Sequence, residues 1–366
     1  MGKYKVSVLS DRHEITIHEL DLREPEGKEV LVKIDSSAIC TLEQRVYEGI
    51  RKLYPFAGGH EASGTVEKVG KKVKTVKPGD KVVIRTLNTC GECHYCRSGN
   101  ENQCVVSYQA SIHEGLRGPG GIAEHMMIDA KNVYKMADDV DLEYAALTEP
   151  LACCIHSVNN AHIELGEDVV VMGVGIMGAF HIQLSKLRGA RVIACEIDEK
   201  RMEVAKKMGA DIVLNSTNME DVKAKVNELT ENRGADVVFC TVPSTKVAED
   251  CIHLTGKLGR VIMYTSFHPD NPVPISVNHV HSSEMIITGA VSPRNKDFQT
   301  AARLISNKVI NLEGLITATV PMMDIEEAYK KALDPGAYRV IIKCDPAVND
   351  YSQSKQQVKT KEMIAS

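Results

Sequence analysis

Four cysteines lie within fifteen residues of one another and form the densest group of metal-ligand side chains in the sequence. Their spacing is C-x2-C-x2-C-x7-C, in Cys90, Cys93, Cys96 and Cys104. Four thiolates on one looped segment complete a tetrahedral Zn²⁺ site and leave no position for water. Iron–sulfur ligation uses the same side chains, but the chain offers no obvious electron partner. Free thiols packed this closely are an oxidation liability. The spacing therefore predicts a structural zinc site, with His94 as a bystander.

Three glycines form a second group with informative spacing. Gly173, Gly175 and Gly178 make G-x-G-x-x-G, directly after an apolar run and at the head of a stretch with helical spacing. In that context the glycines form a tight turn, admit a pyrophosphate and let the helix pack on the strand. Ile176 and Met177, between the glycines, are also predicted to contact the dinucleotide. The alternative is a plain tight turn between strand and helix.

An acidic residue ends the next predicted strand. Glu196 lies 18 residues after the third glycine, where a carboxylate accepts hydrogen bonds from an adenosine ribose and repels a 2′-phosphate. Because no Arg follows it directly, NAD is predicted rather than NADP. Asp198 is the alternative acid. Arg201 either stacks on the adenine or belongs to a solvated helix face.

A catalytic zinc ion needs three protein ligands and an open position, so a second metal site would be assembled from separate segments. Cys40, at the end of a predicted strand, and His60, in PFAGGHEASGTV, are the candidates. A lone Cys is more often a small buried hydrophobe, and a lone His is more often a hydrogen-bonded loop residue. The order and surroundings of these two favour a metal site.

The composition limits the class of protein. The chain has 366 residues, 43% apolar and 25% charged, with 44 Lys and Arg against 49 Asp and Glu, a net charge of −5. This length favours two domains. The dispersed basic residues argue against nucleic-acid binding. The N-terminus lacks a secretion signal and no apolar run is long enough for a membrane helix, so we expect a cytoplasmic protein. Most of the eleven cysteines are then thiols or metal ligands.

The elements that position these residues show two different sequence patterns. Residues 1–150 alternate short β-branched runs with turns, which is typical of a β-rich domain. From residue 163, apolar runs alternate with helical stretches, which predicts a parallel sheet with crossover helices. A later strand, YRVIIKC, is positioned to rejoin the first domain. We therefore expect an α/β protein with a β-rich domain of 1–150 completed by 293–345, a second domain of 151–292, and a polar tail of 346–366, disordered or loosely packed.

At this point the chain resembles the zinc-dependent medium-chain dehydrogenase/reductase family, within it the polyol (sorbitol-like) and threonine dehydrogenases. The resemblance covers about residues 1–343. The matching motifs are Cys40 with Tyr47 and Gly49, the GHE of Gly59, His60 and Glu61 followed by Gly64 and Val66, KPGD at 77–80, the four cysteines, GGIAEHMMI at 120–128, EPLAC at 149–153 and the glycine motif at 173–178. The resemblance implies a GroES-like catalytic domain and an inserted Rossmann domain with a doubly wound parallel sheet.

The resemblance also implies a site. Cys40, His60 and Glu149 are then the zinc ligands, and Glu61 is a further carboxylate that ligates directly or through water. Classical alcohol dehydrogenases of the family carry Cys at the position of Glu149. The implied reaction is hydride transfer from a secondary alcohol, a polyol or sugar alcohol, to NAD, with zinc polarising the substrate oxygen. Thiolate and carboxylate ligands neutralise Zn²⁺, and an ionised Glu61 would make the site negative. A homo-oligomer, dimer or tetramer, is implied as well.

The chain departs from the family pattern after Cys40. The family places Ser or Thr two residues later, as a proton relay, and often His five residues later, where this chain has Leu42 and Arg45. Thr41, Glu43 and Tyr47 are possible substitutes, and Glu43 is preferred because a carboxylate is a competent base at neutral pH. For Arg45, a salt bridge to Glu43 is slightly favoured over contact with an anionic substrate.

Two other functions remain open. Arg45, Arg117 and Arg294 would suit a dehydrogenase of an amino alcohol or of an anionic hydroxy compound, threonine-like or a phosphorylated polyol. The missing relay hydroxyl would suit a binding protein that has lost turnover. Retention of the Cys40, His60, Glu61 and Glu149 set speaks against the loss of turnover.

Overall fold

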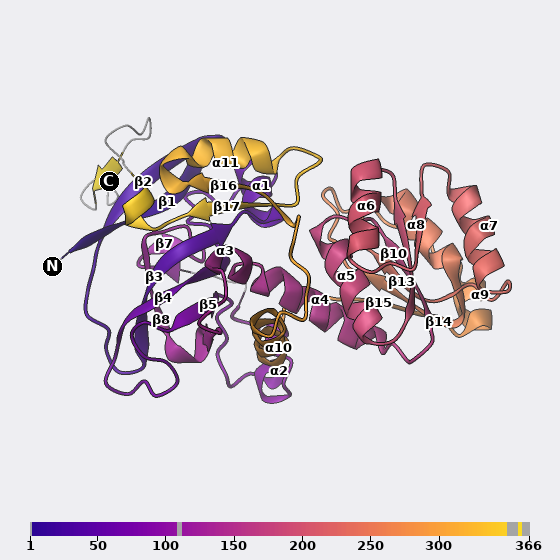
Figure 1. Cartoon of the computed structure of the whole chain (residues 1–366), viewed down its shortest axis with the longest axis horizontal. Helices are drawn as coiled ribbons and strands as arrows, with labels where there is room; N and C mark the ends of the chain where they lie inside the picture. Colours follow the sequence, from indigo (N-terminus) through magenta and orange to yellow (C-terminus); the bar gives the residue numbers. More distant parts are fainter. Residues whose placement is uncertain (1, 108–111, 350–357, 361–366) are drawn as a thin grey trace. The chain divides into compact units, whose positions relative to one another are not determined.

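The computed structural model describes residues 2–107, 112–349 and 358–360 (Figure 1). The chain forms two compact units. The first contains Met1–Glu149 and Arg294–Ser366, and the second contains Pro150–Pro293. The chain therefore builds most of the first unit, then the whole of the second, and returns to complete the first.

The second unit is built on one sheet of six parallel strands. In spatial order these are β12 (Ile212–Asn215), β11 (Arg191–Glu196), β10 (Asp168–Met172), β13 (Ala235–Cys240), β14 (Thr255–Met263) and β15 (Ile286–Gly289). All five residues of β10 are buried, as the continuous apolar run requires of a strand covered on both faces. The strand order reverses beside β10, which is the doubly wound Rossmann arrangement and the place where such sheets bind ligands.

Helices follow the strands of this unit in sequence. They are α5 (Ile176–Leu187), α6 (Glu199–Lys207), α7 (Met219–Leu229), α8 (Thr245–Leu254) and α9 (Val277–Ser283). Val170, Cys195 and Val238 of the sheet share one core with Val226 of α7 and Cys251 of α8. The turn between β10 and α5 contains the glycine motif, so the topology brings that motif to the carboxyl edge of the sheet.

The first unit is β-rich. Its main sheet has the order β16 (Ile316–Pro321), β17 (Arg339–Lys343), β3 (Glu29–Ala38), β4 (Glu61–Val69), β5 (Lys81–Arg85) and β9 (Val133–Lys135), with β8 (His125–Asp129) also paired to β3. The last strand in the chain of this sheet, β17, pairs antiparallel with β3. The chain segment after the second unit therefore completes the sheet that the N-terminal segment begins.

Smaller elements surround this sheet. A second sheet pairs β1 (Lys3–Asp11), β2 (Glu14–Asp21) and β18 (Val358–Thr360), and a hairpin joins β6 (Ile112–His113) to β7 (Leu116–Arg117). The helices are α1 (Thr41–Tyr47), α2 (His94–Arg97), α3 (Leu142–Ala145), α10 (Asn295–Ser306) and α11 (Ile325–Ala332), with short 3₁₀ turns η1 (Glu101–Gln103), η2 (Ala130–Asn132), η3 (Met322–Asp324) and η4 (Pro346–Val348). Helix α4 (Thr148–Ala161) begins in the first unit and continues into the second, which starts at Pro150.

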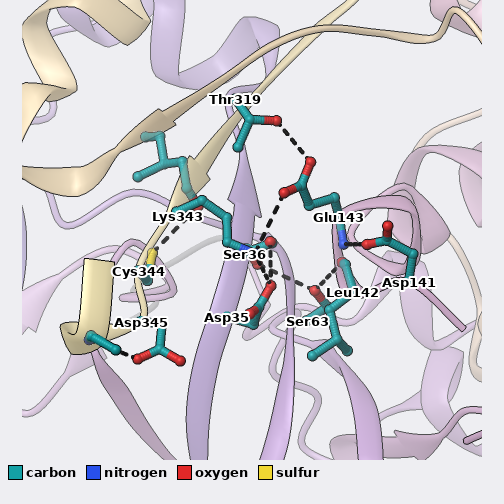
Figure 2. Close-up of polar contacts among 12 residues, drawn as sticks. Asp35, Ser36, Ser63, Asp141, Leu142, Glu143, Thr319, Lys343, Cys344 and Asp345 are labelled. Atoms are coloured by element: carbon teal, nitrogen blue, oxygen red, sulfur yellow. Dashed lines mark hydrogen bonds and ion pairs between the residues drawn. The ribbon is translucent and has the colours of Figure 1, made fainter. Parts of the chain in front are cut away.

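A polar network fixes the returning segment (Figure 2). The Lys343 ammonium lies 2.7 Å from an Asp35 carboxylate oxygen and 3.5 Å from one of Glu143, and the Thr319 hydroxyl donates to Glu143 at 2.8 Å. Burial lowers the pKa of Lys343, but hydrogen bonding to Asp35 and the charges of Asp35 and Glu143 outweigh it, so the pKa is raised. The network links β17 and β16 to β3 and α3.

Part of the polar tail, expected to be disordered or loosely packed, forms regular structure. Residues 346–348 form η4, and 358–360 pair in parallel with β2, with Val358 opposite Ile17. Residues 350–357 and 361–366 lie outside the described part of the chain, so the expected disorder is not addressed there. A strand in so polar a segment is a feature that composition does not predict. Among the described residues, no helix combines the length and apolarity needed to cross a membrane.

Candidate active site

Cys40 lies where β3 gives way to α1. It is the N-cap of α1 in extended conformation, and the Glu43 carboxylate in the first turn of the helix accepts a hydrogen bond from the Cys40 backbone N–H at 3.3 Å. This capping arrangement fixes both side chains on one turn. A thiol and a carboxylate from nearby positions are thus brought to the carboxyl end of β3.

The loop before β4 brings His60 against this turn. Gly59 has φ +99°, and a Cβ there would lie 2.3 Å from the backbone nitrogen of Ile122. A Cβ on Gly58 would lie 2.9 Å from Cγ of Glu43. Both positions need glycine, because the loop passes too close to its neighbours for a side chain. The close approach places the His60 imidazole beside Glu43.

Glu43 orients His60. One carboxylate oxygen of Glu43 accepts hydrogen bonds from His60 Nδ1 at 2.9 Å and from the Gly59 backbone N–H at 3.0 Å. Glu43 is fully buried. Burial raises the pKa of its carboxyl, but the charge and hydrogen bond of His60 and the hydrogen bond of Gly59 outweigh burial and lower that pKa. A carboxylate on Nδ1 leaves Nε2 for a metal ion, which is how histidine ligands are commonly held.

The structure brings the predicted catalytic residues into two overlapping groups. Donor atoms of Cys40, Glu43 and His60 lie within 4.8 Å of one another, and so do those of His60, Glu61 and Glu149. Glu149 comes from the first turn of α4. Sulfur, imidazole nitrogen and carboxylate oxygen are the donors that zinc takes in proteins. The residues present therefore fit a zinc ion, with His60 common to both groups.

Arg339 is a site residue that the sequence analysis missed. Its guanidinium donates to both oxygens of Glu61, at 2.9 and 2.8 Å, and a third contact reaches Cys40 Sγ at 3.6 Å. Burial lowers the pKa of Arg339, but the charges of Glu61, Cys40 and Glu149 outweigh it and raise that pKa. The signal in the sequence is an Arg in the apolar strand YRVIIKC, because a buried guanidinium needs a partner.

The contacts of Glu43 bear on the relay expected there. Three donors, on His60, Gly59 and Cys40, use its two carboxylate oxygens. Burial and the charge of Arg51 lower the pKa of Arg45, and the charge of Cys40 opposes them, so the expected salt bridge between Glu43 and Arg45 stays a prediction. These contacts favour a role for Glu43 in positioning His60.

The other relay candidates have different surroundings. Tyr47 is buried and its ring stacks on that of Tyr329, with centroids 4.5 Å apart. Thr41 is exposed, and Leu42 packs against the core of the first unit. Tyr47 therefore contributes to the core of the first unit.

The four-cysteine segment folds into a lobe around α2 and η1. Sγ of Cys90 lies 3.6 Å from that of Cys104 and 3.9 Å from that of Cys96. Zn–S bonds of about 2.3 Å in a tetrahedron would place neighbouring sulfurs about 3.8 Å apart. Backbone N–H groups of Cys90 and Cys93 donate to Cys104 and Cys90 sulfurs, each at 3.3 Å. The donor set and its spacing fit a closed zinc site, and His94 is not part of the group.

Hydrogen bonding favours the thiolate at one of these cysteines. Burial raises the pKa of Cys104, but backbone hydrogen bonds from Cys90 and Val106 and side-chain hydrogen bonds with Cys90 and Ser107 lower it to about 6. A metal binds the thiolate form, so this environment prepares Cys104 as a ligand.

The glycine turn has the shape of a dinucleotide cradle. Gly173 has φ +89°, and a Cβ on Gly178 would lie 2.0 Å from the Gly173 carbonyl oxygen. Glycine is required at these two positions by the backbone conformation and close packing of the turn. Gly175 differs, because nothing lies within 4 Å of the place its Cβ would take. Open space over this glycine, at the N-terminus of α5, leaves room for a pyrophosphate to approach the backbone. Ile176 and Met177 form the first turn of α5.

Glu196 ends β11 and closes the same turn. Its carboxylate accepts hydrogen bonds from the backbone N–H of Val174 at 2.7 Å, of Ile197 at 2.7 Å and of Asp198 at 3.1 Å. Asp198, the alternative acid, caps α6 and accepts from the Arg201 N–H at 2.9 Å. Glu196 therefore lies beside the glycine turn, where a ribose hydroxyl has acceptor positions left on the carboxylate.

Comparison with known proteins adds to this geometry. Residues 26–138 match a family model described as an alcohol dehydrogenase GroES-like domain, and residues 173–307 match one described as a zinc-binding dehydrogenase. The D-arabitol-phosphate dehydrogenase of Enterococcus avium is 31% identical over 335 residues, which cover 89% of this chain and 94% of the relative. The chain belongs to the zinc-dependent medium-chain dehydrogenase family.

Other members of the family support the same assignment. The sorbitol dehydrogenase of Halalkalibacterium halodurans is 30% identical over 328 residues, with 87% of this chain and 92% of the relative covered. A solved Escherichia coli structure, an oxidoreductase/dehydrogenase of unknown specificity, superposes with a TM-score of 0.86 at 25% identity and covers 93% of this chain and 99% of that one. The predicted family and the predicted fold class, a GroES-like domain with a Rossmann domain, are confirmed.

Proposed function

We propose that this family member is an NAD-dependent, zinc-containing dehydrogenase of a secondary alcohol, with a polyol or sugar alcohol as substrate. One observation carries the proposal: the donor atoms of Cys40 and of Glu149 each lie within 4.8 Å of that of His60, beside the buried Glu61–Arg339 pair. The names of the sorbitol and D-arabitol-phosphate dehydrogenases support a polyol. Glu149 supports the same choice, since the resemblance assigns Glu there to the polyol and threonine branches.

Each residue of the first unit has a separate task in this proposal. Cys40, His60 and Glu149 hold the zinc ion, which when bound supplies a Lewis acid for the substrate oxygen. Arg339 holds Glu61 with two hydrogen bonds and cancels its charge. The negative site that an ionised Glu61 would create is thereby avoided. The zinc ligands are left with two negative charges, which match the two positive charges of the ion.

The second unit binds the hydride acceptor. Gly175 leaves the backbone open to the pyrophosphate, and the N-terminus of α5 favours an anion. The Glu196 carboxylate accepts a ribose hydroxyl and repels a 2′-phosphate, which supports NAD over NADP. Binding and orientation are thus the contributions of this unit, and the chemistry of hydride acceptance belongs to NAD.

A screen of alcohols on the zinc-loaded protein tests the proposal. Polyols, their phosphate esters, threonine and simple secondary alcohols are supplied with NAD⁺ or NADP⁺, and reduced cofactor is followed by absorbance. We expect turnover with a polyol-type substrate and NAD⁺, and none in the His60→Ala variant. Turnover with threonine alone, or a preference for NADP⁺, would contradict the proposal.

A further inference from the structure

We propose that Thr241 is a positioning residue of the dinucleotide site, because its hydroxyl and the Glu196 carboxylate hold the two ends of one peptide group in the glycine turn. That peptide group joins Gly173 to Val174. Since the pyrophosphate of NAD is the expected ligand of this turn, the inference rests on the proposed function. All of the residues involved belong to the second unit, and Thr241 lies outside the glycine motif.

Thr241 directly follows β13, the strand beside β10 in the sheet (Figure 1). Its hydroxyl donates to two successive carbonyl oxygens at the end of β10, that of Met172 at 2.7 Å and that of Gly173 at 3.1 Å. One proton serves both oxygens as a three-centre hydrogen bond. The Thr241 backbone N–H also donates to the Met172 oxygen, at 3.1 Å. Loss of the hydroxyl would therefore leave the Met172 oxygen one donor and would fall mainly on the Gly173 oxygen.

Glu196 holds the same peptide group at its other end. Its Oε2 accepts a hydrogen bond from the Val174 N–H at 2.7 Å, and Glu196 ends β11, the strand on the opposite side of β10. The Gly173 N–H donates to the Cys195 carbonyl of that strand at 2.8 Å. Side chains at the ends of both neighbouring strands thus bind this peptide group, and rotation of its plane would break both side-chain hydrogen bonds.

The orientation of this peptide group sets the geometry of the turn. Gly173 has φ +89°, and a Cβ there would lie 2.6 Å from Val242 Cγ2 and 2.9 Å from Thr241 Oγ1. A Cβ on Gly178 would lie 2.0 Å from the Gly173 oxygen, so α5 packs on the same peptide group. Fixing the peptide group therefore fixes the start of α5. The first N–H groups of a helix have no partner within it, and these are the groups that bind a phosphate.

Loss of the Thr241 hydroxyl should act on pyrophosphate binding and not on hydride transfer. Without this donor the turn populates orientations in which the first N–H groups of α5 do not converge on the ligand. The apparent affinity then falls with the fraction of molecules that keep the competent turn. We expect the dissociation constant and KM for NAD⁺ to rise, while kcat at saturating NAD⁺ stays within about twofold.

Three substitutions in the zinc-loaded, full-length protein test the role of Thr241. Thr241→Val keeps the shape and removes the hydroxyl, and Thr241→Ser keeps the hydroxyl. Thr255→Val is the matched control, because the Thr255 hydroxyl donates to the Cys251 carbonyl at 2.9 Å. Thr255 begins β14 at the amino end of the parallel sheet, whereas Thr241 follows the carboxyl end of β13.

Binding of NAD⁺ and of ADP-ribose is measured by calorimetry, because both contain the pyrophosphate and ADP-ribose lacks the nicotinamide. Thr241→Val should bind both ligands about fivefold or more weakly, as the loss of one hydrogen bond allows. Thr241→Ser and Thr255→Val should stay within about twofold of wild type. Thermal unfolding of all variants, and KM and kcat with the alcohol that the screen identifies, complete the measurement.

The outcomes separate failure of this role from failure of the proposed function. Equal ADP-ribose affinity in wild type and Thr241→Val overturns the positioning role and leaves the NAD-dependent dehydrogenase standing. A loss seen with NAD⁺ alone, or a loss of the same size in Thr255→Val, also overturns it. A wild-type preference for NADP⁺ contradicts the proposed cofactor, and weaker NADP⁺ binding in Thr241→Val then retains the role of Thr241. Wild-type protein that binds no dinucleotide overturns both.

Discussion

Arg339 binds Glu61 through two hydrogen bonds across 278 residues of sequence. Glu61 begins β4, directly after His60, and Arg339 begins β17, the strand that returns to the first unit after the second is complete. Both side chains are almost fully buried. The last strand of this sheet in the chain therefore supplies the charge that balances a carboxylate beside the predicted metal ligands. We therefore expect the predicted metal site to depend on the returning segment.

Removing the guanidinium should destabilise the protein strongly. Arg339→Met leaves the Glu61 carboxylate buried without its partner, and breaking a buried pair this way costs about 3–5 kcal/mol. Urea unfolding measures the loss. The double variant Arg339→Met, Glu61→Leu removes both charges and should recover much of the stability. A single variant that unfolds within about 1 kcal/mol of wild type would show that the pair is not important for folding.

Glu43→Gln should weaken zinc binding more than it slows the loaded enzyme. The variant keeps the shape but turns an amide N–H₂ toward donors on His60, Gly59 or Cys40, and loss of such a supporting partner typically costs about 10- to 100-fold in metal affinity. Zinc affinity and turnover at saturating zinc are both measured. Glu48→Gln, at the end of the same helix, serves as the control. A fall in turnover of about 100-fold with normal zinc affinity would instead assign Glu43 to proton transfer.

The two arrangements that the sequence predicted correctly depend on local patterns. The glycine turn between strand and helix and the four-cysteine lobe each place their residues within one short segment, so spacing alone fixes which side chains meet. The partnership of Glu43 with His60 depends on Gly58 and Gly59 passing close to α1, which is a tertiary contact that no periodicity reveals.

Arg339 shows the same limit at longer range. It was visible as an Arg in an apolar strand, but its partner could be known only from the pairing of β17 with β3 and of β3 with β4. The contacts of Glu43 with His60 and Gly59 could not be predicted for a related reason: the sequence analysis considered the order of residues after Cys40 and not the loop that packs on them. The proton-relay role of Glu43 stays a prediction. Tertiary contacts between residues far apart in the sequence cannot be predicted from the order of residues alone.

Metal analysis of the replete protein should give two zinc ions per chain. Cys93→Ser should lose one zinc and at least about 2 kcal/mol of unfolding free energy, because a closed metal site stabilises the lobe that contains it. His60→Ala should lose turnover while the protein stays folded. Elemental analysis, urea unfolding and activity on both variants check this. The reverse pattern, in which Cys93→Ser folds normally without activity, would mean that the two sites were exchanged.

Two glycines of one motif should respond differently to the same substitution. Gly178→Ala places a Cβ 2.0 Å from the Gly173 carbonyl oxygen and should destabilise the second unit by about 1–3 kcal/mol. Gly175→Ala meets nothing within 4 Å and its φ of −66° suits Ala, so the fold should tolerate it. The new methyl group should weaken NAD binding about tenfold or more, about 1.4 kcal/mol. Thermal unfolding and NAD titration separate the two. Unchanged NAD affinity in Gly175→Ala would show that the pyrophosphate does not bind at this turn.

His181 should make the second unit sensitive to acid. It is fully buried on α5, where Nδ1 donates to the Met177 carbonyl at 2.7 Å, Nε2 accepts from the Ser157 hydroxyl at 2.8 Å, and the ring packs on Phe239 and Tyr264. Burial lowers its pKa from 6.5 to about 4. The folded state therefore binds fewer protons than the unfolded state between these values.

Stability from His181 is fully present above pH 6.5 and is lost as the pH falls toward 4, by up to about 3 kcal/mol. The test compares the free energy of unfolding of wild type and His181→Gln from pH 7.5 to pH 5, because other groups titrate in both proteins and cancel in the difference. We expect the wild type to lose stability more steeply than the variant. Parallel curves of unfolding free energy against pH, or a His181 imidazole that titrates near pH 6.5 by NMR in the folded protein, would contradict this prediction. Either result would show that the folded state does not disfavour protonation of His181.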